Sequence, residues 1–338
     1  MSEPSISVVV PAYNRPRELT ELLDSVLTQV VTPQQVLVRE DKSPQRDEIR
    51  AICLEYGRRL AGRGIELTYA ENETNIGYDK NLRKCIESAS SDWAFVLGND
   101  DLLLPNAVRD LVSFVRHHDV DFVSRAFIRF NTDVDRPIGV SSISARDAIF
   151  NKENAPPRMI FRAAGFVGGL AIRTDFARKH TSREFDGSLY YQIYLASIAY
   201  CENGIGYVST PIVGGRADNP PMFGGADDDR DVHVPGSYTA KGRARMWKGV
   251  LDIARHVGER SGYNLLDDLK RELAVRQSFH VFEMNVASSR TELRNLRDAL
   301  SELDLYSHAF PKFLYTLNYI TGRCAIVFYW LFRKLIQR

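Results

Sequence analysis

The fold of this chain is decided by the stretch DWAFVLGNDDLLLP, residues 92–105. It begins as an apolar run of the length of a buried strand, stops at Gly98, and then places two adjacent carboxylates before a proline-started helix. In an open α/β sheet, the loops at the carboxyl ends of the strands surround the ligand crevice. Asp100 and Asp101 could therefore hold a divalent cation and, through it, phosphates. The alternative is that Asp101 or Asn99 only caps the helix.

Strand-like and helix-like segments alternate over the first two thirds of the chain. Strands are expected at residues 5–10, 35–39, 65–70, 93–97, 121–130, 170–172 and 204–210. Helices are expected at residues 16–27, 49–60, 78–89, 105–118, 189–200, 241–259, 265–286 and 291–303. This alternation predicts an α/β fold, a mostly parallel sheet with helices on both faces, followed by a C-terminal helical appendage.

The carboxyl edge of the predicted sheet gathers polar side chains from separate turns. They are Tyr13, Asn14, Asp41, Asn75, Asp100 and Asp101. Gly168 and Gly169 precede a short strand, where the backbone either approaches a ligand or forms a bulge. Residues 214–236 are rich in glycine, proline and aspartate, which is typical of a long loop that covers a site. Residues 131–157 are polar and are expected to form loops.

The composition is that of an ordinary soluble globular protein, with 44% hydrophobic and 26% charged residues among 338. A formal net charge of +1 gives no overall attraction to nucleic acid. The four cysteines are far apart, with no pair at metal-ligand or redox-motif spacing. Because the N-terminus lacks a charged region followed by a long apolar core, we expect no secretory signal and a reducing, cytoplasmic setting.

The last 28 residues concentrate one sign of charge. They contain five cations and no acid, a charge of +5, which leaves 1 − 5 = −4 for residues 1–310. Aromatic residues interleave with these cations, as in an amphipathic segment at a membrane interface. The longest apolar run, 324–332, is about half the ~20 residues that a spanning helix needs. We therefore expect a catalytic domain at 1–215, a lid loop and helical acceptor-side region at 216–310, and a membrane-associating tail at 311–338.

Four motifs, in this order, resemble those of the family 2 glycosyltransferases of the GT-A fold, a Rossmann-like architecture. The motifs are SVVVPAYNR at residues 7–15, Glu40-Asp41, Asn75-Ile76-Gly77, and LGNDD at residues 97–101. The resemblance covers residues 5–215. The Gly-Asn-Asp-Asp form and the later segments GRADN at 215–219 and KGRAR at 241–245 are similar to enzymes of bacterial O-antigen assembly, abequosyltransferases in particular.

The resemblance implies a nucleotide-diphosphate sugar donor. Asp41 would accept a hydrogen bond from the nucleobase, and Asp100, the last acid of the family's Asp-x-Asp motif, would bind Mg²⁺ or Mn²⁺ against the diphosphate. Gly98 stands in place of the first acid, so the ribose contact comes from Asn99 or is lost. Asp101 would support the metal ligand or bind a sugar hydroxyl. The implied donor-site residues are Pro11, Ala12, Tyr13, Asp41, Asn75, Asn99 and Arg216.

Sugar transfer develops negative charge on the leaving diphosphate, which a cation and nearby Arg or Lys side chains would stabilise. Arg216, Lys241, Arg243 and Arg245 either close over this charge or form a solvated basic face.

An inverting enzyme also needs a proton acceptor for the attacking hydroxyl. Family 2 enzymes usually supply an acid where this chain has Tyr190-Tyr191-Gln192. Either Asp186 or Glu184 serves instead, or the reaction retains configuration with the leaving phosphate as base. Asp186 could also only cap the helix that follows it.

We therefore hypothesise a metal-dependent glycosyltransferase. It would act on a polyprenyl-diphosphate-linked glycan at the cytoplasmic face of the inner membrane, where its C-terminal tail holds it peripherally. The alternative is a catalytically inactive nucleotide-sugar-binding scaffold on the same fold, suggested by Gly98 and the missing acid. A sugar-phosphate nucleotidyltransferase would need a glycine- and arginine-rich loop after the first strand, and residues 11–15 do not form one.

Overall fold

The computed structural model of this protein describes residues 3–220, 222, 224–226, 233 and 239–336. The chain divides into two compact units, Met1–Ser237 and Tyr238–Arg338. The boundary expected at residue 215 lies inside the first unit, one residue before its last strand ends. The tail expected from residue 311 lies inside the second unit.

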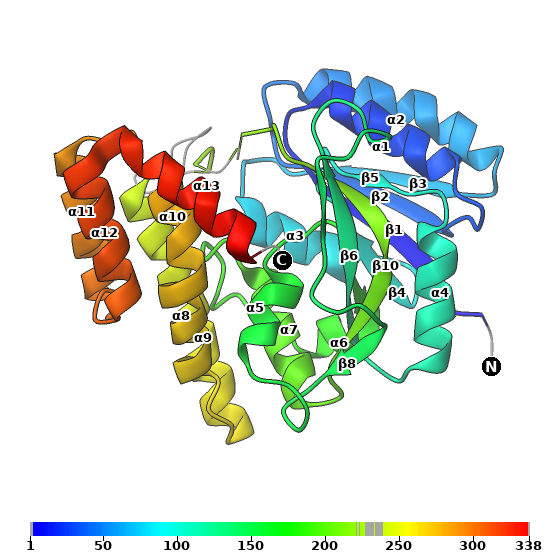
Figure 1. The fold of residues 1–338 in the computed structure, drawn as a ribbon. Helices are drawn as coiled ribbons and strands as arrows, with labels where there is room; N and C mark the ends of the chain where they lie inside the picture. The colour runs from blue at the N-terminus through cyan, green and yellow to red at the C-terminus, as the bar shows by residue number, and fades with distance from the viewer. Residues whose placement is uncertain (1–2, 221, 223, 227–232, 234–238, 337–338) are drawn as a thin grey trace. The chain divides into compact units, whose positions relative to one another are not determined.

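One mixed sheet organises the first unit (Figure 1). Its strands are β1 (Ile6–Ala12), β2 (Gln35–Glu40), β3 (Glu66–Glu71), β4 (Trp93–Val96), β5 (Leu102–Leu103), β6 (Phe122–Phe130), β7 (Gly139–Ser141), β8 (Ala148–Phe150), β9 (Leu170–Arg173) and β10 (Ile205–Arg216). The main path runs β3-β2-β1-β4-β9-β6-β10-β5. Strands β1 to β4, β6 and β10 share one direction, and β9 runs against its neighbours β4 and β6. The predicted mostly parallel sheet is confirmed.

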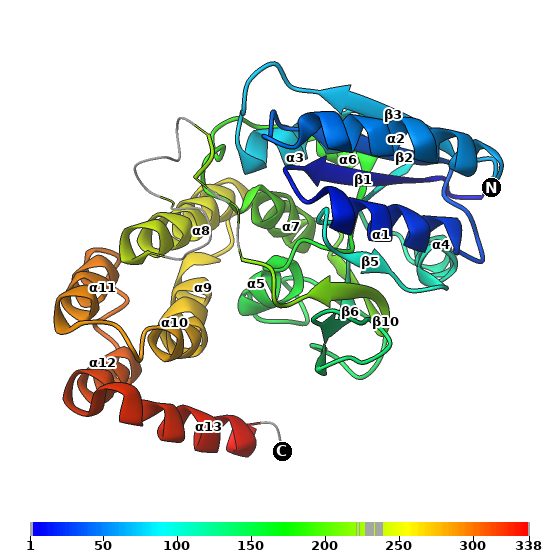
Figure 2. The same ribbon diagram turned by 90° about the horizontal axis from the view of Figure 1, so that it is seen from above.

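Helices cover both faces of this sheet, as predicted (Figure 2). The apolar stripes of α1 (Pro16–Leu27), α2 (Arg46–Ala61) and α4 (Ala107–His117) share one core cluster with the strands. The other face is covered by α3 (Tyr78–Glu87), α5 (Arg158–Ala164), α6 (Thr174–Lys179) and α7 (Tyr191–Cys201).

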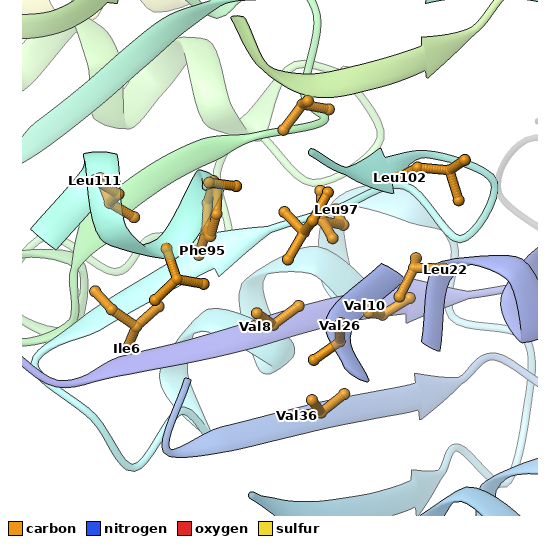
Figure 3. Close-up of a cluster of buried hydrophobic side chains, with 14 of the residues drawn as sticks. Ile6, Val8, Val10, Leu22, Val26, Val36, Phe95, Leu97, Leu102 and Leu111 are labelled. Carbon is orange, nitrogen blue, oxygen red and sulfur yellow. The ribbon is translucent and has the colours of Figure 1, made fainter. Parts of the chain in front are cut away.

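Strand β1 lies centrally and is buried on both faces. Ile6, Val8 and Val10 pack into the cluster that contains Leu22 and Val26 of α1 (Figure 3). The residues between them along the strand are also fully buried. This double burial is why the strand shows a continuous apolar run in the sequence instead of alternation.

Two expectations fail where elements are short. Residues 131–157 contain β7 and β8, which pair with β6 and β10, although three-residue strands are too short to show a periodicity. After Asp101 the chain forms β5, and α4 begins only at Ala107, with Asn106 at its N-cap and no side-chain cap. The interpretation that Asp101 or Asn99 caps this helix is therefore wrong.

The described part of the second unit is helical, as predicted. Its helices are α8 (Ala240–Ser261), α9 (Leu266–Glu272), α10 (Ser278–Met284), α11 (Arg290–Glu302), α12 (Ala309–Thr321) and α13 (Ala325–Ile336). A π-helical turn, Leu273–Gln277, separates α9 from α10, so the helix expected at 265–286 is interrupted. A short 3₁₀ turn, Gly322–Cys324, joins α12 to α13.

Helix α13 has one packed face and one exposed apolar face. The Tyr329 hydroxyl donates to Asn318 Oδ1 on α12 at 2.8 Å, and Asn318 Nδ2 donates to the carbonyl oxygen of Phe282 on α10 at 2.7 Å. The opposite face exposes about half of each of four large apolar side chains. They are Ile326, Val327, Trp330 and Leu331. Among the helices that the structure describes, none combines the length and apolar character needed to cross a membrane.

Candidate functional site

The turn from β1 into α1 has a strained backbone. Asn14 and Arg15 both have positive φ angles, 55° and 63°, which residues other than glycine rarely adopt. Asn99 holds this turn because its Nδ2 donates to the carbonyl oxygens of Tyr13, at 3.2 Å, and Asn14, at 2.9 Å. Asn99 is thus engaged with backbone through its amide nitrogen, and its proposed ribose contact stays a prediction.

Asp100 presents a partly exposed carboxylate at this edge of the sheet. Its Oδ2 accepts from Arg15 Nη1 at 2.6 Å and from Asn219 Nδ2 at 2.9 Å. Arg15 comes from the turn after β1, and Asn219 from the segment after β10. Three separate turns therefore meet at one carboxylate oxygen.

Asp101 points inward and is only 3% exposed. Its Oδ1 accepts from the backbone N–H of Arg216 at 3.3 Å. A Cβ at Gly168 would lie 2.0 Å from Asp101 Oδ2, and one at Gly98 would lie 2.8 Å from the same atom. Both glycines therefore leave room for this carboxylate. Burial, and then the charge of Asp100, raise the pKa of Asp101 to about 8.

These contacts explain two features noted in the sequence. Gly98 replaces the family's first acid because the neighbouring Asp101 already fills the space that a side chain would need. The backbone at Gly168 approaches a protein carboxylate, and Gly169 has a φ of 88° that favours glycine.

A buried cation that the sequence-based reasoning missed lies near Asp101. Arg125, on β6, donates to the carbonyl oxygens of Phe166, at 3.1 Å, and Gly168. Its guanidinium also lies 5.0 and 4.9 Å from the ring centroids of Phe127 and Phe166. Burial lowers the pKa of Arg125 to about 9, and Asp101 opposes this shift. The available signal was an arginine in the middle of a mostly apolar strand.

Asp41 is buried where β2 ends and organises the neighbouring turn. Its carboxylate accepts from Asn72 Nδ2 at 2.9 Å and from the backbone N–H groups of Ile76 and Gly77 at 2.9 and 3.0 Å. Burial raises its pKa against the opposing effect of these donors. Asn75, inside this turn, accepts from the Gly77 N–H at 3.1 Å. Since only β1 separates β2 from β4, Asp41 and Asp100 lie at the same edge of the sheet.

Arg216, at the end of β10, uses all three guanidinium nitrogens within the protein. Nε donates to the carbonyl oxygen of Asp100 at 3.2 Å, Nη1 to that of Asn131 at 3.0 Å, and Nη2 pairs with Glu21. The guanidinium carbon also lies 4.7 Å from the ring centroid of Phe130. Arg216 therefore holds the turn of Asp100 in place, and its donor contact stays a prediction.

The segment after β10 reaches the predicted donor pocket. A Cβ at Gly225 would lie 2.8 Å from the Tyr13 hydroxyl and 2.9 Å from Asn75 Nδ2. Gly225, in the loop expected at 214–236, thus lies against two predicted donor-site residues. Residues 221, 223, 227–232 and 234–236 of this loop lie outside the described residues. Lys241, Arg243 and Arg245 belong to α8 of the second unit, so their role in closure stays a prediction.

Helix α3 holds the segment that was expected to supply a base. Arg83 binds Asp186 through two hydrogen bonds, Nη2 to Oδ2 at 2.8 Å and Nε to Oδ1 at 3.3 Å, with both side chains more than nine-tenths buried. One turn earlier, Asp79 accepts from the backbone N–H groups of Gly187, Leu189 and Tyr191 at 2.7 to 3.0 Å.

The N-cap of α7 is Tyr190, with no side-chain cap, so the interpretation of Asp186 as a helix cap is wrong.

Burial raises the pKa of Asp79 to about 7 despite its hydrogen bonds. Sequence-based reasoning missed Asp79 and Arg83, because charged side chains on a helix are usually exposed to solvent.

Comparison with known protein families agrees with this arrangement. The family model described as glycosyl transferase family 2 matches residues 7–175. The chain belongs to glycosyltransferase family 2. The matched range includes the turns that carry Asp41, Asp100 and Asp101.

Relatives of this family 2 protein share modest identity. An uncharacterized glycosyltransferase of Haemophilus influenzae is 25% identical over 179 residues, 49% of this chain and 56% of the relative. The abequosyltransferase RfbV of Salmonella typhimurium is 21% identical over 243 residues, 63% of this chain and 67% of the relative. The putative glycosyltransferase EpsE of Bacillus subtilis matches over 40% of its length at 27% identity. The chain thus spans about half the length of the first curated relatives.

Solved structures share the fold along almost the whole chain. TarS of S. aureus in complex with UDP has a TM-score of 0.59 and 16% identity, with 95% of this chain and 92% of TarS covered. The mannosyltransferase PcManGT of Pyrobaculum calidifontis, in complex with GDP-Man and Mn²⁺, has a TM-score of 0.52 and 13% identity, with 97% and 88% covered. The expected GT-A fold is confirmed.

A divalent cation at Asp100 fits the residues present. Within the described residues, no three His, Cys, Asp or Glu side chains gather closely enough to hold a metal alone. Mg²⁺ is often bound by one or two carboxylates, substrate phosphates and water, and Asp100 can supply one such ligand. The guanidinium of Arg15 at this carboxylate shows that the position accommodates positive charge.

Proposed function

We propose that this protein is a glycosyltransferase that moves one sugar from a nucleotide-diphosphate donor to a polyprenyl-diphosphate-linked glycan in O-antigen or other surface polysaccharide assembly. The observation that carries the proposal is the position of Asp41 and Asp100, from separate βα turns, at one edge of the sheet. The relative RfbV, named an abequosyltransferase, supports the sugar-transfer class. TarS binds UDP and UDP-GlcNAc on a similar fold, which supports a nucleotide-sugar donor.

The donor would bind along this edge. Asp41 and the turn that it organises would contact the nucleobase, with Pro11, Ala12 and Tyr13 on the other side of the pocket. Asp100 would hold Mg²⁺ or Mn²⁺, which supplies positive charge to the diphosphate as it leaves. Asp101 and Arg216 would keep Asp100 in position. The backbone N–H of Arg216 donates to Asp101, and the Arg216 guanidinium donates to the carbonyl oxygen of Asp100.

Transfer forms a bond between the sugar C1 and the acceptor oxygen and breaks the bond between C1 and the diphosphate oxygen, and the acceptor hydroxyl loses its proton. Asp186 is our candidate for the proton acceptor, and Arg83 fixes the orientation of its carboxylate. Glu184 is the alternative acid on the same segment. With retention of configuration, the leaving phosphate would take the proton and no acid would be needed here.

A polyprenyl-linked acceptor lies in the membrane, so the enzyme must bind at the membrane surface. We propose that α13 makes this contact. Its exposed Ile326, Val327, Trp330 and Leu331 would enter the interfacial region of the bilayer. The five cations of residues 311–338 would attract anionic lipid, at about 1 kcal/mol for each cation near the surface. We therefore place the protein peripherally on the cytoplasmic face of the inner membrane.

Donor hydrolysis tests the proposal. The purified protein, with Mn²⁺ and a panel of nucleotide sugars, should release nucleoside diphosphate from at least one of them. Asp100→Ala should abolish the release, and Asp47→Ala, which removes an exposed acid from α2, should leave it unchanged. Binding of a nucleotide sugar without any release, with either acceptor or water, would favour the inactive scaffold that Gly98 and the missing acid suggest.

A further inference from the structure

The cation that neutralises Asp100 belongs to the chain itself. Arg15 Nη1 lies 2.6 Å from Asp100 Oδ2, and both side chains are less than one-fifth exposed. The Arg15 Nη2 donates to the carbonyl oxygen of Pro220, which lies next to Asn219, the second donor to the same carboxylate oxygen. One guanidinium therefore links the turn after β1, the turn after β4 and the segment after β10.

The backbone directs this contact. Arg15 is the N-cap residue of α1 and has φ and ψ angles of 63° and 52°, directly after Asn14, which is also left-handed. The Arg15 N–H donates to Gln45 Oε1 at 3.3 Å, and Asn99 holds the preceding carbonyl oxygens. Strained backbone of this kind persists only where its surroundings hold it, which is common at binding sites.

We infer that Arg15 is an internal counter-cation of Asp100, which a divalent cation must displace, and that the displaced guanidinium then binds the diphosphate. A metal ion bound to either oxygen of Asp100 would lie close to the guanidinium, and two cations at one carboxylate repel each other in a partly buried site. Guanidinium groups bind phosphate oxygens as well as they bind carboxylates, so the released side chain has a new partner in the donor. The inference rests on the proposed function, because it assumes a metal and a diphosphate at this edge.

Mn²⁺ binding without nucleotide tests the first half. In Arg15→Gln, which keeps the side chain's polar end and removes its charge, electron paramagnetic resonance of free Mn²⁺ should report about two- to fivefold tighter binding, the range expected for a partly exposed ion pair. The matched control is Arg17→Gln, an equal charge change two residues away on a side chain that is 77% exposed, and it should leave the affinity unchanged. Equal or weaker Mn²⁺ binding by Arg15→Gln would overturn the inference.

Nucleotide binding tests the second half. At saturating Mn²⁺, calorimetry with UDP and with GDP should show weaker binding by Arg15→Gln than by Arg17→Gln for whichever nucleotide binds the unaltered protein. Unchanged affinity would overturn the transfer of Arg15 to the diphosphate. If the unaltered protein binds Mn²⁺ and a nucleotide but neither affinity responds to Arg15→Gln, only this inference fails. If it binds neither, the proposed function fails with it.

A second variant keeps the test decisive if Arg15→Gln does not fold. Arg15→Lys keeps the charge. The signal that is present in the ¹⁵N spectrum of the unaltered protein and missing in that of Arg15→Lys belongs to the Arg15 Nε–H group. In the unaltered protein that signal should shift on titration with Mg²⁺, with the same midpoint as Mg²⁺ binding. A signal that does not move while Mg²⁺ binds would contradict displacement.

Discussion

Charged groups are buried at the sheet edge of the first unit, whereas large apolar side chains are exposed on helix α13 of the second unit. At the sheet edge, Asp41, Asp101 and Arg125 are almost fully buried, and each has partners within the chain. On α13, Trp330 and Leu331 are large apolar side chains that are 55% and 50% exposed. Buried charge needs internal partners, whereas an exposed apolar face indicates a partner outside the chain. The comparison therefore separates the buried charges of the candidate site from the apolar face through which we propose that the protein binds a membrane.

Breaking the pair of Asp186 and Arg83 should have the largest effect. If Asp186 is the proton acceptor, Asp186→Asn should lower kcat by about 10²–10⁴, the usual contribution of a general base. It should also lower the melting temperature, because the buried Arg83 loses its counter-charge. Steady-state kinetics and thermal unfolding measure the two effects.

The double variant Arg83→Gln with Asp186→Asn separates catalysis from stability. It should recover much of the melting temperature and none of the turnover. Recovery of turnover would mean that the pair is only structural, and the leaving phosphate would then be the better candidate for the base.

Charging the exposed face of α13 should have the next largest effect. Val327→Glu with Leu331→Glu should weaken binding to anionic vesicles by more than about 100-fold, since burial of each of these side chains contributes about 1.5–3 kcal/mol. The melting temperature should not change, because these side chains lie opposite the packed face of Tyr329. Vesicle sedimentation measures the binding.

Leu54 gives the matched control from the first unit. It is 68% exposed on α2, and Leu54→Glu should leave vesicle binding unchanged. If Leu54→Glu weakens vesicle binding as much as the α13 variant does, the exposed apolar face of α13 does not determine membrane binding.

Restoring the family's first acid should destabilise this protein. In Gly98→Asp, the new Cβ would lie 2.8 Å from Asp101 Oδ2 and 3.2 Å from Asp100 Oδ1, and the new charge would repel that of Asp100. We expect a loss of about 1–3 kcal/mol in the free energy of unfolding, as for other overpacked sites. Chemical denaturation measures it, and adding Asp101→Gly should recover part of the loss. A fully stable Gly98→Asp protein would show that this turn has room for a second arrangement.

The smallest expected effect at neutral pH is the contribution of Asp79 to stability, and this contribution depends on pH. The pKa of Asp79 is raised from 3.8 to about 7 in the folded state, so the folded state binds a proton more tightly than the unfolded state. The stabilisation from this group is therefore complete below about pH 4 and is lost as the pH rises toward 7. The melting temperature of Asp79→Asn should fall below that of the unaltered protein by the largest margin near pH 4. A margin that grows toward pH 7 would contradict the assigned direction.

Local patterns were sufficient for most of the fold and for part of the site. Continuous apolar runs identified β1 and β4, and the turn motifs placed Asp41 and Asp100 at one edge. The sequence did not reveal that Arg125 lies near Asp101, because β6 and β4 are joined only through β9 in the sheet. It likewise could not pair Arg15 with Asp100, 85 residues apart.

By itself, the sequence determined which elements form and which side chains follow the strands, since hydrophobic periodicity and turn residues are local properties. Only the tertiary structure decided which of those side chains meet. The close packing of β10 and β9 against the turn after β4 directs Asp101 inward and leaves Asp100 outward beside Arg15. Two adjacent, chemically identical residues thus acquire different roles, because their burial depends on neighbours that are distant in the chain.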